Sequence, residues 1–134
     1  MISNPPVQLV TLDDIRAAAV RIRDVAVRTP ILEVAVGSVG KRSAREEVVE
    51  RGAPATLALK CENLQPMGAF KIRGACNMIA QLAPGARAAG VITFSSGNHG
   101  QAVALVARHF GIPAVLVMPT TAPALKIEGG QEYG

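Results

Sequence analysis

Two short segments of the chain carry residues that could act together on a ligand. Residues 70–75 contain a lone lysine, Lys71, at the predicted start of a helix, and residues 95–100 form a polar, glycine-bracketed loop between a predicted strand and helix. A lysine amine can form an imine with an aldehyde, and a loop rich in N–H donors can hold an anion. The pair indicates a lysine that binds an aldehyde cofactor and a loop that binds an amino-acid carboxylate.

The loop at residues 95–100 follows a predicted strand, and ligands of parallel α/β sheets bind beyond the carboxyl ends of strands. Gly97 and Gly100 would let the backbone approach a ligand, and the free N–H groups of the next helical turn would favour an anion. Further side-chain donors come from Ser95, Ser96, Asn98 and His99. Serine and asparagine also cap helices for purely structural reasons, so a plain helix cap stays open as the alternative.

Lys71 directly follows Phe70, and the polar loop comes later in the chain. The sequences around Lys41, Lys60 and Lys126 have no comparable features. Imine chemistry requires a neutral amine. From the residues alone, the alternative is an ordinary surface lysine that begins an amphipathic helix.

Other kinds of site find little support in the sequence. The glycines fit neither GxGxxG nor GxxxxGK, so neither a dinucleotide nor a P-loop fingerprint is present. His99 and His109 are ten positions apart on a predicted helix and would not share a metal ion, and we expect no metal site. Cys61 and Cys76 are isolated thiols, which indicates neither a zinc site nor a disulfide framework and fits a reducing cytoplasm.

The composition favours an α/β class. The 134 residues are 49% hydrophobic, which suffices for one modest domain or part of one, and with 3% aromatic residues the core must come from Val, Ile, Leu and Ala. The net charge is +4, but the basic residues are scattered and too few aromatic residues are present for base stacking, so we expect no nucleic-acid partner. No signal peptide is visible and charged residues interrupt the apolar stretches, so we expect no membrane contact.

The pattern of apolar and turn residues predicts the elements that position these segments. Thr11 should cap a first helix that runs to about Val25 or Val27, and Pro84-Gly85 should end the helix that starts near Phe70. The remaining predictions are a short helix at 42–50, a strand at 56–60, a loop at 62–68, a strand at 91–94, a helix at 98–110 and a strand at 114–118. The last three predict a β–α–β unit with parallel strands.

Several motifs together resemble one enzyme family. They are residues 28–30, 60–66, 68–75, 95–102 and 119–123, so the resemblance covers nearly the whole chain. The chain resembles the threonine dehydratase and serine racemase group of pyridoxal-phosphate enzymes, the fold type II or tryptophan synthase beta-like group. The resemblance implies parallel-sheet β–α–β units, with residues 1–90 in the N-terminal part of a larger cofactor domain and residues 91–134 at the start of a smaller one.

The same resemblance implies roles for particular residues. Lys71 would hold pyridoxal 5'-phosphate as a Schiff base, Phe70 would pack beside it, and Asn98 would hydrogen-bond the 3-hydroxyl of the pyridine ring. The substrate carboxylate would be gripped by Ser95, Ser96, Gly97 and His99. Ser96 would serve in acid/base chemistry on the face opposite Lys71. The implied reaction is the dehydration of threonine or serine to a 2-keto acid and ammonia, and the alternative is serine racemisation.

The chain also departs from the family pattern. Ala69 stands where a hydroxyl residue is usual and Met67 where threonine is common, which bears on substrate preference and on the polarity of the cofactor site. The segment from Gly37 to Thr56 is longer than usual. A β-replacement enzyme similar to cysteine synthase is disfavoured by the sequence His99-Gly100.

The glycine-rich phosphate cup of the family is not found within the chain. We do not interpret Gly129-Gly130 as that cup, because it is too short and Gln-Glu follows it. The sequence therefore indicates an N-terminal fragment, and we expect the complete form to be a homo-oligomer that acts on a small amino-acid substrate. A truncated, non-catalytic remnant or binding module is the competing interpretation, because a lysine without the cup should hold the cofactor weakly.

Overall fold

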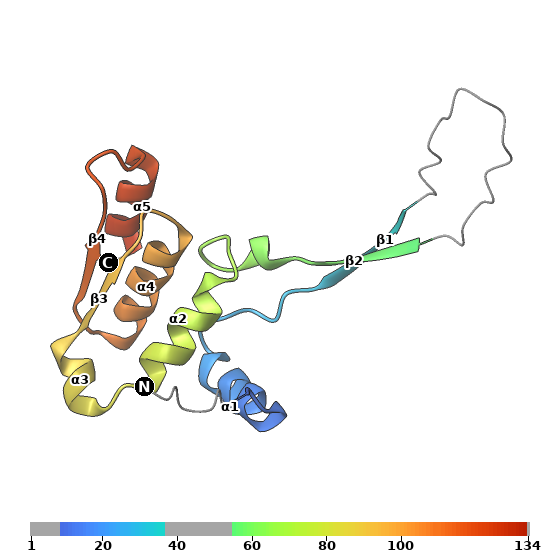
Figure 1. The fold of residues 1–134 in the computed structure, drawn as a ribbon, viewed down its shortest axis with the longest axis horizontal. Coiled ribbons are helices and arrows are strands. Elements are labelled where there is room, and N and C mark those ends of the chain that lie inside the picture. Colours follow the sequence, from blue (N-terminus) through green and yellow to red (C-terminus); the bar gives the residue numbers. More distant parts are fainter. Residues whose placement is uncertain (1–8, 37–54, 134) are drawn as a thin grey trace, which may run out of the picture.

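The computed structural model describes residues 9–36 and 55–133. Figure 1 shows a body of helices and strands from which a two-stranded hairpin projects. In chain order the elements are α1 (Leu12–Ile22), β1 (Ile31–Val36), β2 (Ala55–Lys60), a 3-10 turn η1 (Glu62–Leu64), α2 (Lys71–Ala80), α3 (Pro84–Ala89), β3 (Val91–Phe94), α4 (Asn98–Phe110), β4 (Ala114–Val117) and α5 (Ala124–Tyr133). The helix predicted at 42–50 lies outside the described residues.

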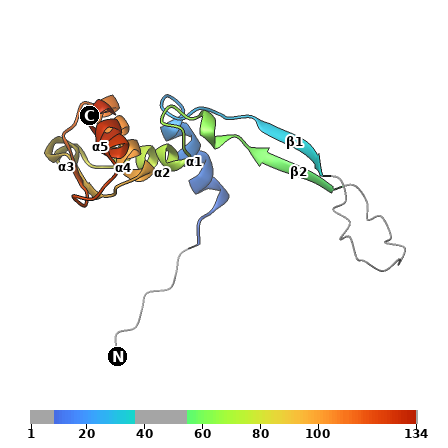
Figure 2. The same ribbon diagram turned by 90° about the horizontal axis from the view of Figure 1, so that it is seen from above.

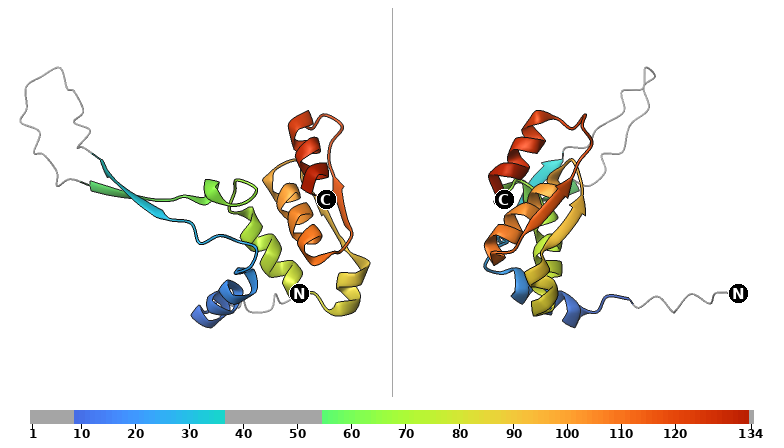
Figure 3. Two further views of the ribbon diagram at one scale, coloured as in Figure 1. Left: turned by 180° about the vertical axis from the view of Figure 1, so that it is seen from behind. Right: turned by 90° about the vertical axis from the view of Figure 1, so that its left-hand side faces the viewer.

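The predicted parallel β–α–β unit is confirmed. Strands β3 and β4 pair in parallel, with Val91 opposite Ala114 and Phe94 opposite Val117. Helix α4 packs against one face of this pair, as Figure 3 shows. Because side chains alternate along a strand, the residues of the other face are exposed, and they are Ile92, Phe94, Val115 and Val117. The unit places the loop at residues 95–100 at the carboxyl end of β3.

The core of the body lies between α2 and α4. The buried side chains of α2 recur every three or four positions, which is the spacing of one helical face, and they are Ile72, Ala75, Cys76 and Ile79. They pack against Ala102, Val103 and Val106 of α4. This packing brings the first turn of α2, where Lys71 lies, alongside α4.

The start of α1 is as expected and its end is earlier. Thr11 forms a capping box with Asp14, in which the Thr11 hydroxyl accepts from the Asp14 N–H at 3.2 Å and the Asp14 carboxylate accepts from the Thr11 N–H at 2.9 Å. The helix ends at Ile22 with Arg23 as its C-cap, and a turn follows in which the Val25 N–H donates to the Ile22 carbonyl. The prediction of an end near Val25 or Val27 was therefore wrong by about one turn.

Strands β1 and β2 form an antiparallel hairpin, in which Ile31 pairs with Lys60 and Val34 with Leu57. The sequence predicted β2, as a strand at 56–60, but not β1. The hairpin projects from the helical body (Figure 2), and side chains on both of its faces are exposed, among them Ile31, Leu32 and Leu59. Its ladder accordingly stands apart from the β3–β4 pair.

The helix that starts near Phe70 ends before Pro84-Gly85, as predicted, but α3 was not predicted. Helix α2 ends at Ala80, but Pro84 then begins α3, because proline lacks an N–H that the first helical position does not need. Gly90 ends α3 with φ +88°, and a Cβ there would lie 2.5 Å from the Pro113 carbonyl oxygen. Helix α5 was not predicted. No described helix has both the length and the apolar character that crossing a membrane would require.

Candidate active site

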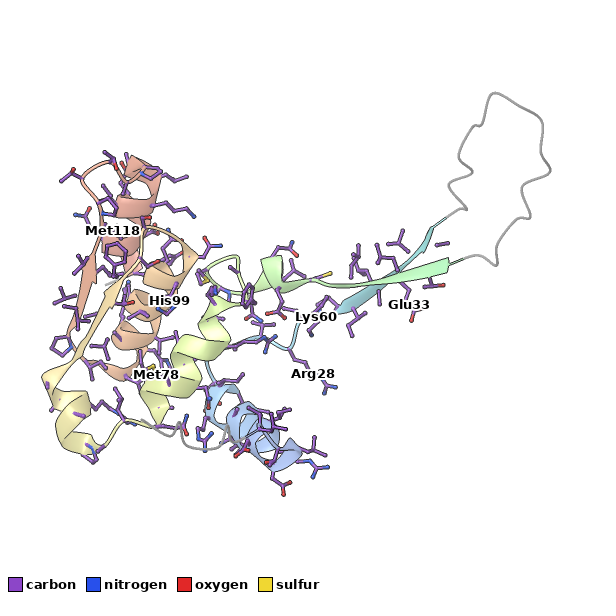
Figure 4. The ribbon with its side chains drawn as sticks, viewed as in Figure 1. Arg28, Glu33, Lys60, Met78, His99 and Met118 are labelled. Atoms are coloured by element: carbon purple, nitrogen blue, oxygen red, sulfur yellow. The ribbon has the colours of Figure 1, made fainter. Side chains whose placement is uncertain are left out.

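The first turn of α2 and the start of α4 meet at a shallow pocket of about 320 Å³. Phe70, Lys71 and Gly74 line it from α2 and its N-cap, and His99 lines it from the first turn of α4. Figure 4 labels His99 in this region. The lysine and the polar loop that the sequence analysis connected are thus neighbours in the fold through His99.

Lys71 is the first residue of α2 and its side chain is exposed. Its Nζ lies 4.8 Å from the centre of the Phe70 ring, which is itself 56% exposed. Among the described residues, the ion pairs do not include Lys71. A ligand can therefore reach the amine without first breaking a salt bridge.

A network centred on Glu62 holds the backbone that carries Lys71. The guanidinium of Arg73, two residues after Lys71, donates to both carboxylate oxygens of Glu62 at 2.8 and 2.7 Å. Thr29 donates to the same carboxylate at 2.6 Å and Gln65 at 3.1 Å. These bonds, led by those from Arg73, lower the pKa of Glu62 to about 2, and the carboxylate in turn raises the pKa of Arg73.

Gln65 ties the loop before Lys71 to the segment before β1. Its buried amide accepts from the Val27 N–H at 2.9 Å and donates to the Val27 carbonyl at 2.8 Å. Arg73 donates to the same carbonyl at 2.9 Å. Glu62, Gln65 and Arg73 fall within the motifs of the sequence, but these contacts could not be predicted, because Val27 and Thr29 are remote from them in the chain.

We predict that Glu62→Gln destabilises the protein in a pH-dependent way. The Glu62 pKa falls from its usual 4.5 to about 2 on folding, so its stabilisation is complete above pH 4.5 and is lost as the pH drops from 4.5 toward 2. The variant should lose about 2 kcal/mol of unfolding free energy at pH 7 and lack this acid dependence. Urea denaturation at pH 7 and pH 3 measures both effects.

Glu33→Gln is the matched control, because Glu33 is an exposed residue on the projecting hairpin (Figure 4). Its unfolding free energy at pH 7 should stay within about 0.5 kcal/mol of the parent protein. Equal losses for the two variants would contradict a specific role for the Glu62 network.

The polar loop begins where β3 ends, and its own backbone shapes it. The Ser95 N–H donates to the Val117 carbonyl at 3.1 Å, and the Ser95 hydroxyl accepts from the Gly97 N–H at 3.2 Å. Gly97 is the N-cap of α4 and provides no side-chain cap for the helix. The loop therefore does not serve as a side-chain cap of α4, which was the alternative interpretation. The N–H groups in the first turn of α4 stay available to a ligand.

Four residues of the predicted site do not line the pocket that contains Lys71, and they are Ser95, Ser96, Gly97 and Asn98. Ser96 is exposed in the loop, and Asn98 is exposed at the first position of α4. The Asn98 carbonyl oxygen, Oδ1, accepts a hydrogen bond from Lys126 of α5 at 2.9 Å. No local signal in the sequence connects Lys126 with Asn98, because the two residues are 28 positions apart.

Gly129 and Gly130 lie within α5, so they form no phosphate-binding loop. This confirms the interpretation made from the sequence. Both cysteines are free, and no three potential metal ligands gather in the part of the chain that the structure describes. The groups at the site are thus an accessible amine, a neighbouring aromatic ring and an uncapped helix start. They fit the aldehyde and ring of pyridoxal phosphate.

Comparisons with known proteins agree with this chemistry. The serine racemase of Schizosaccharomyces pombe is 44% identical over 126 residues, which are 94% of this chain and 35% of that protein. The L-threonine ammonia-lyase of Thermotoga maritima is 41% identical over 94% of this chain and 28% of its own length. The structure of maize serine racemase superposes with a TM-score of 0.74 and 42% identity, covering 92% of this chain and 34% of that one.

The chain spans about a third of the length of the curated relatives that it matches. A family model described as "Pyridoxal-phosphate dependent enzyme" matches residues 28–134, which include both the Lys71 segment and the polar loop. The fold type II α/β architecture expected from the sequence is therefore confirmed, and the chain belongs to the pyridoxal-phosphate-dependent enzyme family.

Proposed function

We propose that this chain contributes to a pyridoxal-phosphate-dependent lyase that converts L-threonine or L-serine to a 2-keto acid and ammonia. The observation that carries the proposal is the shared pocket of Lys71 and His99, in which an accessible amine lies beside the start of an uncapped helix. Membership of the family and the similarity to an L-threonine ammonia-lyase support it.

Lys71 and its neighbours would serve the cofactor. Pyridoxal phosphate, when bound, draws electrons away from the α-carbon of an attached amino acid. Lys71 Nζ would be the amine to which the cofactor aldehyde attaches, and it would accept the α-proton of the substrate. Phe70, whose ring already lies against the lysine, would cover one side of the cofactor ring, and Asn98 would donate to the ring oxygen.

The polar loop would hold the substrate. The free N–H groups at the start of α4 attract a carboxylate, because they are unpaired donors at the positive end of the helix dipole. Ser95, Gly97 and His99 would orient that carboxylate. Ser96 would exchange a proton with the substrate on the face opposite Lys71. Two such groups could also remove the α-proton from one face of the substrate and return a proton to the other face.

Serine racemisation is the second candidate. It is favoured by the 44% identity with a protein named serine racemase. The same two groups would serve both reactions, since Lys71 and Ser96 are proposed on opposite faces of the substrate. The two outcomes differ in whether the β-hydroxyl leaves.

The test is to incubate the cofactor-loaded protein with L-threonine and L-serine and to measure 2-keto acid, ammonia and D-serine. The lyase proposal predicts equal amounts of 2-keto acid and ammonia from either substrate. D-serine without keto acid would favour the racemase instead. If the folded, cofactor-loaded protein forms none of these products, both proposals fail and the non-catalytic remnant stands.

We also propose that the boundary between a larger and a smaller domain lies between Gly90 and Val91. Supporting this, the β3–β4 pair begins at Val91 and shares no ladder with β1–β2 among the described strands. A homo-oligomeric complete form and a cytoplasmic location stay predictions.

A further inference from the structure

Lys126 and Asn98 connect the start of α5 to the start of α4. The Lys126 ammonium donates to Asn98 Oδ1 at 2.9 Å, while the Lys126 N–H is used in the first turn of α5 through the Pro123 carbonyl. Asn98 is the first residue of α4, next to the loop that would hold the substrate. The contact therefore joins α5 to the proposed site.

The packing of the two helices holds this contact in place. Gly129, three residues after Lys126, meets the buried side chain of Gln101, three residues after Asn98, so closely that a Cβ on Gly129 would overlap it. Farther along, Arg108 of α4 donates to the Glu132 carbonyl of α5 at 3.0 Å. The helices thus run side by side in the same direction, and the small residue lets Lys126 reach Asn98.

The hydrogen bond determines which way the Asn98 amide faces. An ammonium only donates, so the amide must offer Oδ1 to Lys126, and its Nδ2 is left to donate to a ligand. None of the ion pairs of the described residues involves Lys126, so its positive charge is not cancelled by a nearby carboxylate there. Both effects favour a ligand oxygen that carries lone pairs and negative charge.

We propose that Lys126 is a positioning residue that orients Asn98 as a hydrogen-bond donor and supplies positive charge behind it. The inference rests on the proposed function, in which Asn98 donates to the ring oxygen of pyridoxal phosphate. Lys126 itself touches neither cofactor nor substrate in this role. It acts through the Asn98 amide.

The test compares Lys126→Met with Arg108→Met. Each variant removes one polar contact between α4 and α5, but only the first removes the contact to Asn98. Lys126→Met should weaken binding of pyridoxal phosphate about tenfold, as expected for the loss of a charged hydrogen-bond partner. Arg108→Met should leave the affinity unchanged. Lys126→Arg, which can still donate to Oδ1, should restore most of it.

Two measurements separate positioning from a structural role. In the cofactor-free protein, the side-chain amide signal of Asn98 in a ¹⁵N NMR spectrum should shift in Lys126→Met and not in Arg108→Met. In an Asn98→Ala background, Lys126→Met should have no further effect on cofactor affinity. Thermal unfolding of each variant reports whether the fold has changed.

An unshifted Asn98 signal in Lys126→Met would overturn the inference, as would equal losses of affinity in the lysine and arginine variants. The proposed function fails in a different way, namely if the parent protein binds no pyridoxal phosphate. The NMR measurement needs no cofactor, so the two failures are distinguishable.

Discussion

Replacing Lys71 with alanine is expected to remove covalent cofactor binding and to lower the rate of keto-acid formation by about 10³-fold or more. The amine is the group to which the cofactor aldehyde would attach, and a methyl side chain cannot form that bond. The measurements are the visible absorption of the loaded protein and its rate with L-threonine.

The fold should survive this substitution. Lys71 is exposed and makes no buried contact that alanine would break, so the unfolding free energy should stay within about 0.5 kcal/mol. Lys71→Arg is the matched control, because it keeps the positive charge beside Phe70 but does not form an imine. A variant lacking the amine that still shows the visible band and full activity would refute the role of Lys71.

Gly100→Ala is expected to cost about 3 kcal/mol of unfolding free energy and to displace the polar loop. A Cβ at Gly100 would lie 2.9 Å from the Ser95 carbonyl oxygen and 2.8 Å from Leu116 Cδ2. The first atom belongs to the backbone, so it cannot move without the loop that would hold the substrate. Urea denaturation measures the stability, and the KM for L-threonine measures the loop.

Gly74→Ala is the control for this prediction. Gly74 is also a helical glycine, but a Cβ there meets nothing within 4 Å. Alanine should stabilise α2 by up to about 1 kcal/mol because it restricts the unfolded chain more than glycine does. If Gly100→Ala is as stable as the parent protein, the close approach between α4 and Ser95 does not constrain the loop.

The elements that the sequence predicted well are those whose signals are local. β3, α4 and β4 match closely, because short apolar strands flank an amphipathic helix and Gly111-Ile112-Pro113 separates the last two. β1 was missed because its ladder partner is distant in sequence, and α3 because Pro84 was interpreted as a stop. Helix α5 was not predicted because it contains Gly129-Gly130, and glycines weaken a helical pattern. At Gly129 a glycine is needed all the same, since the side chain of Gln101 packs closely against it.

The candidate site divides in the same way. Residue types and order connected Lys71 with the polar loop, and the fold brings Lys71 and His99 together. The supports of the site could not be predicted. The Glu62 carboxylate and the Asn98 amide each find partners more than ten positions away, and only tertiary packing selects those partners.

The most direct test of the account is to map where the cofactor attaches. Borohydride reduction of the loaded protein makes the attachment permanent, and mass spectrometry of its peptides then identifies the modified lysine. The account predicts one modified residue, Lys71. Modification of Lys60 or Lys126 with Lys71 untouched, or no modification under conditions in which the protein is folded, would contradict it.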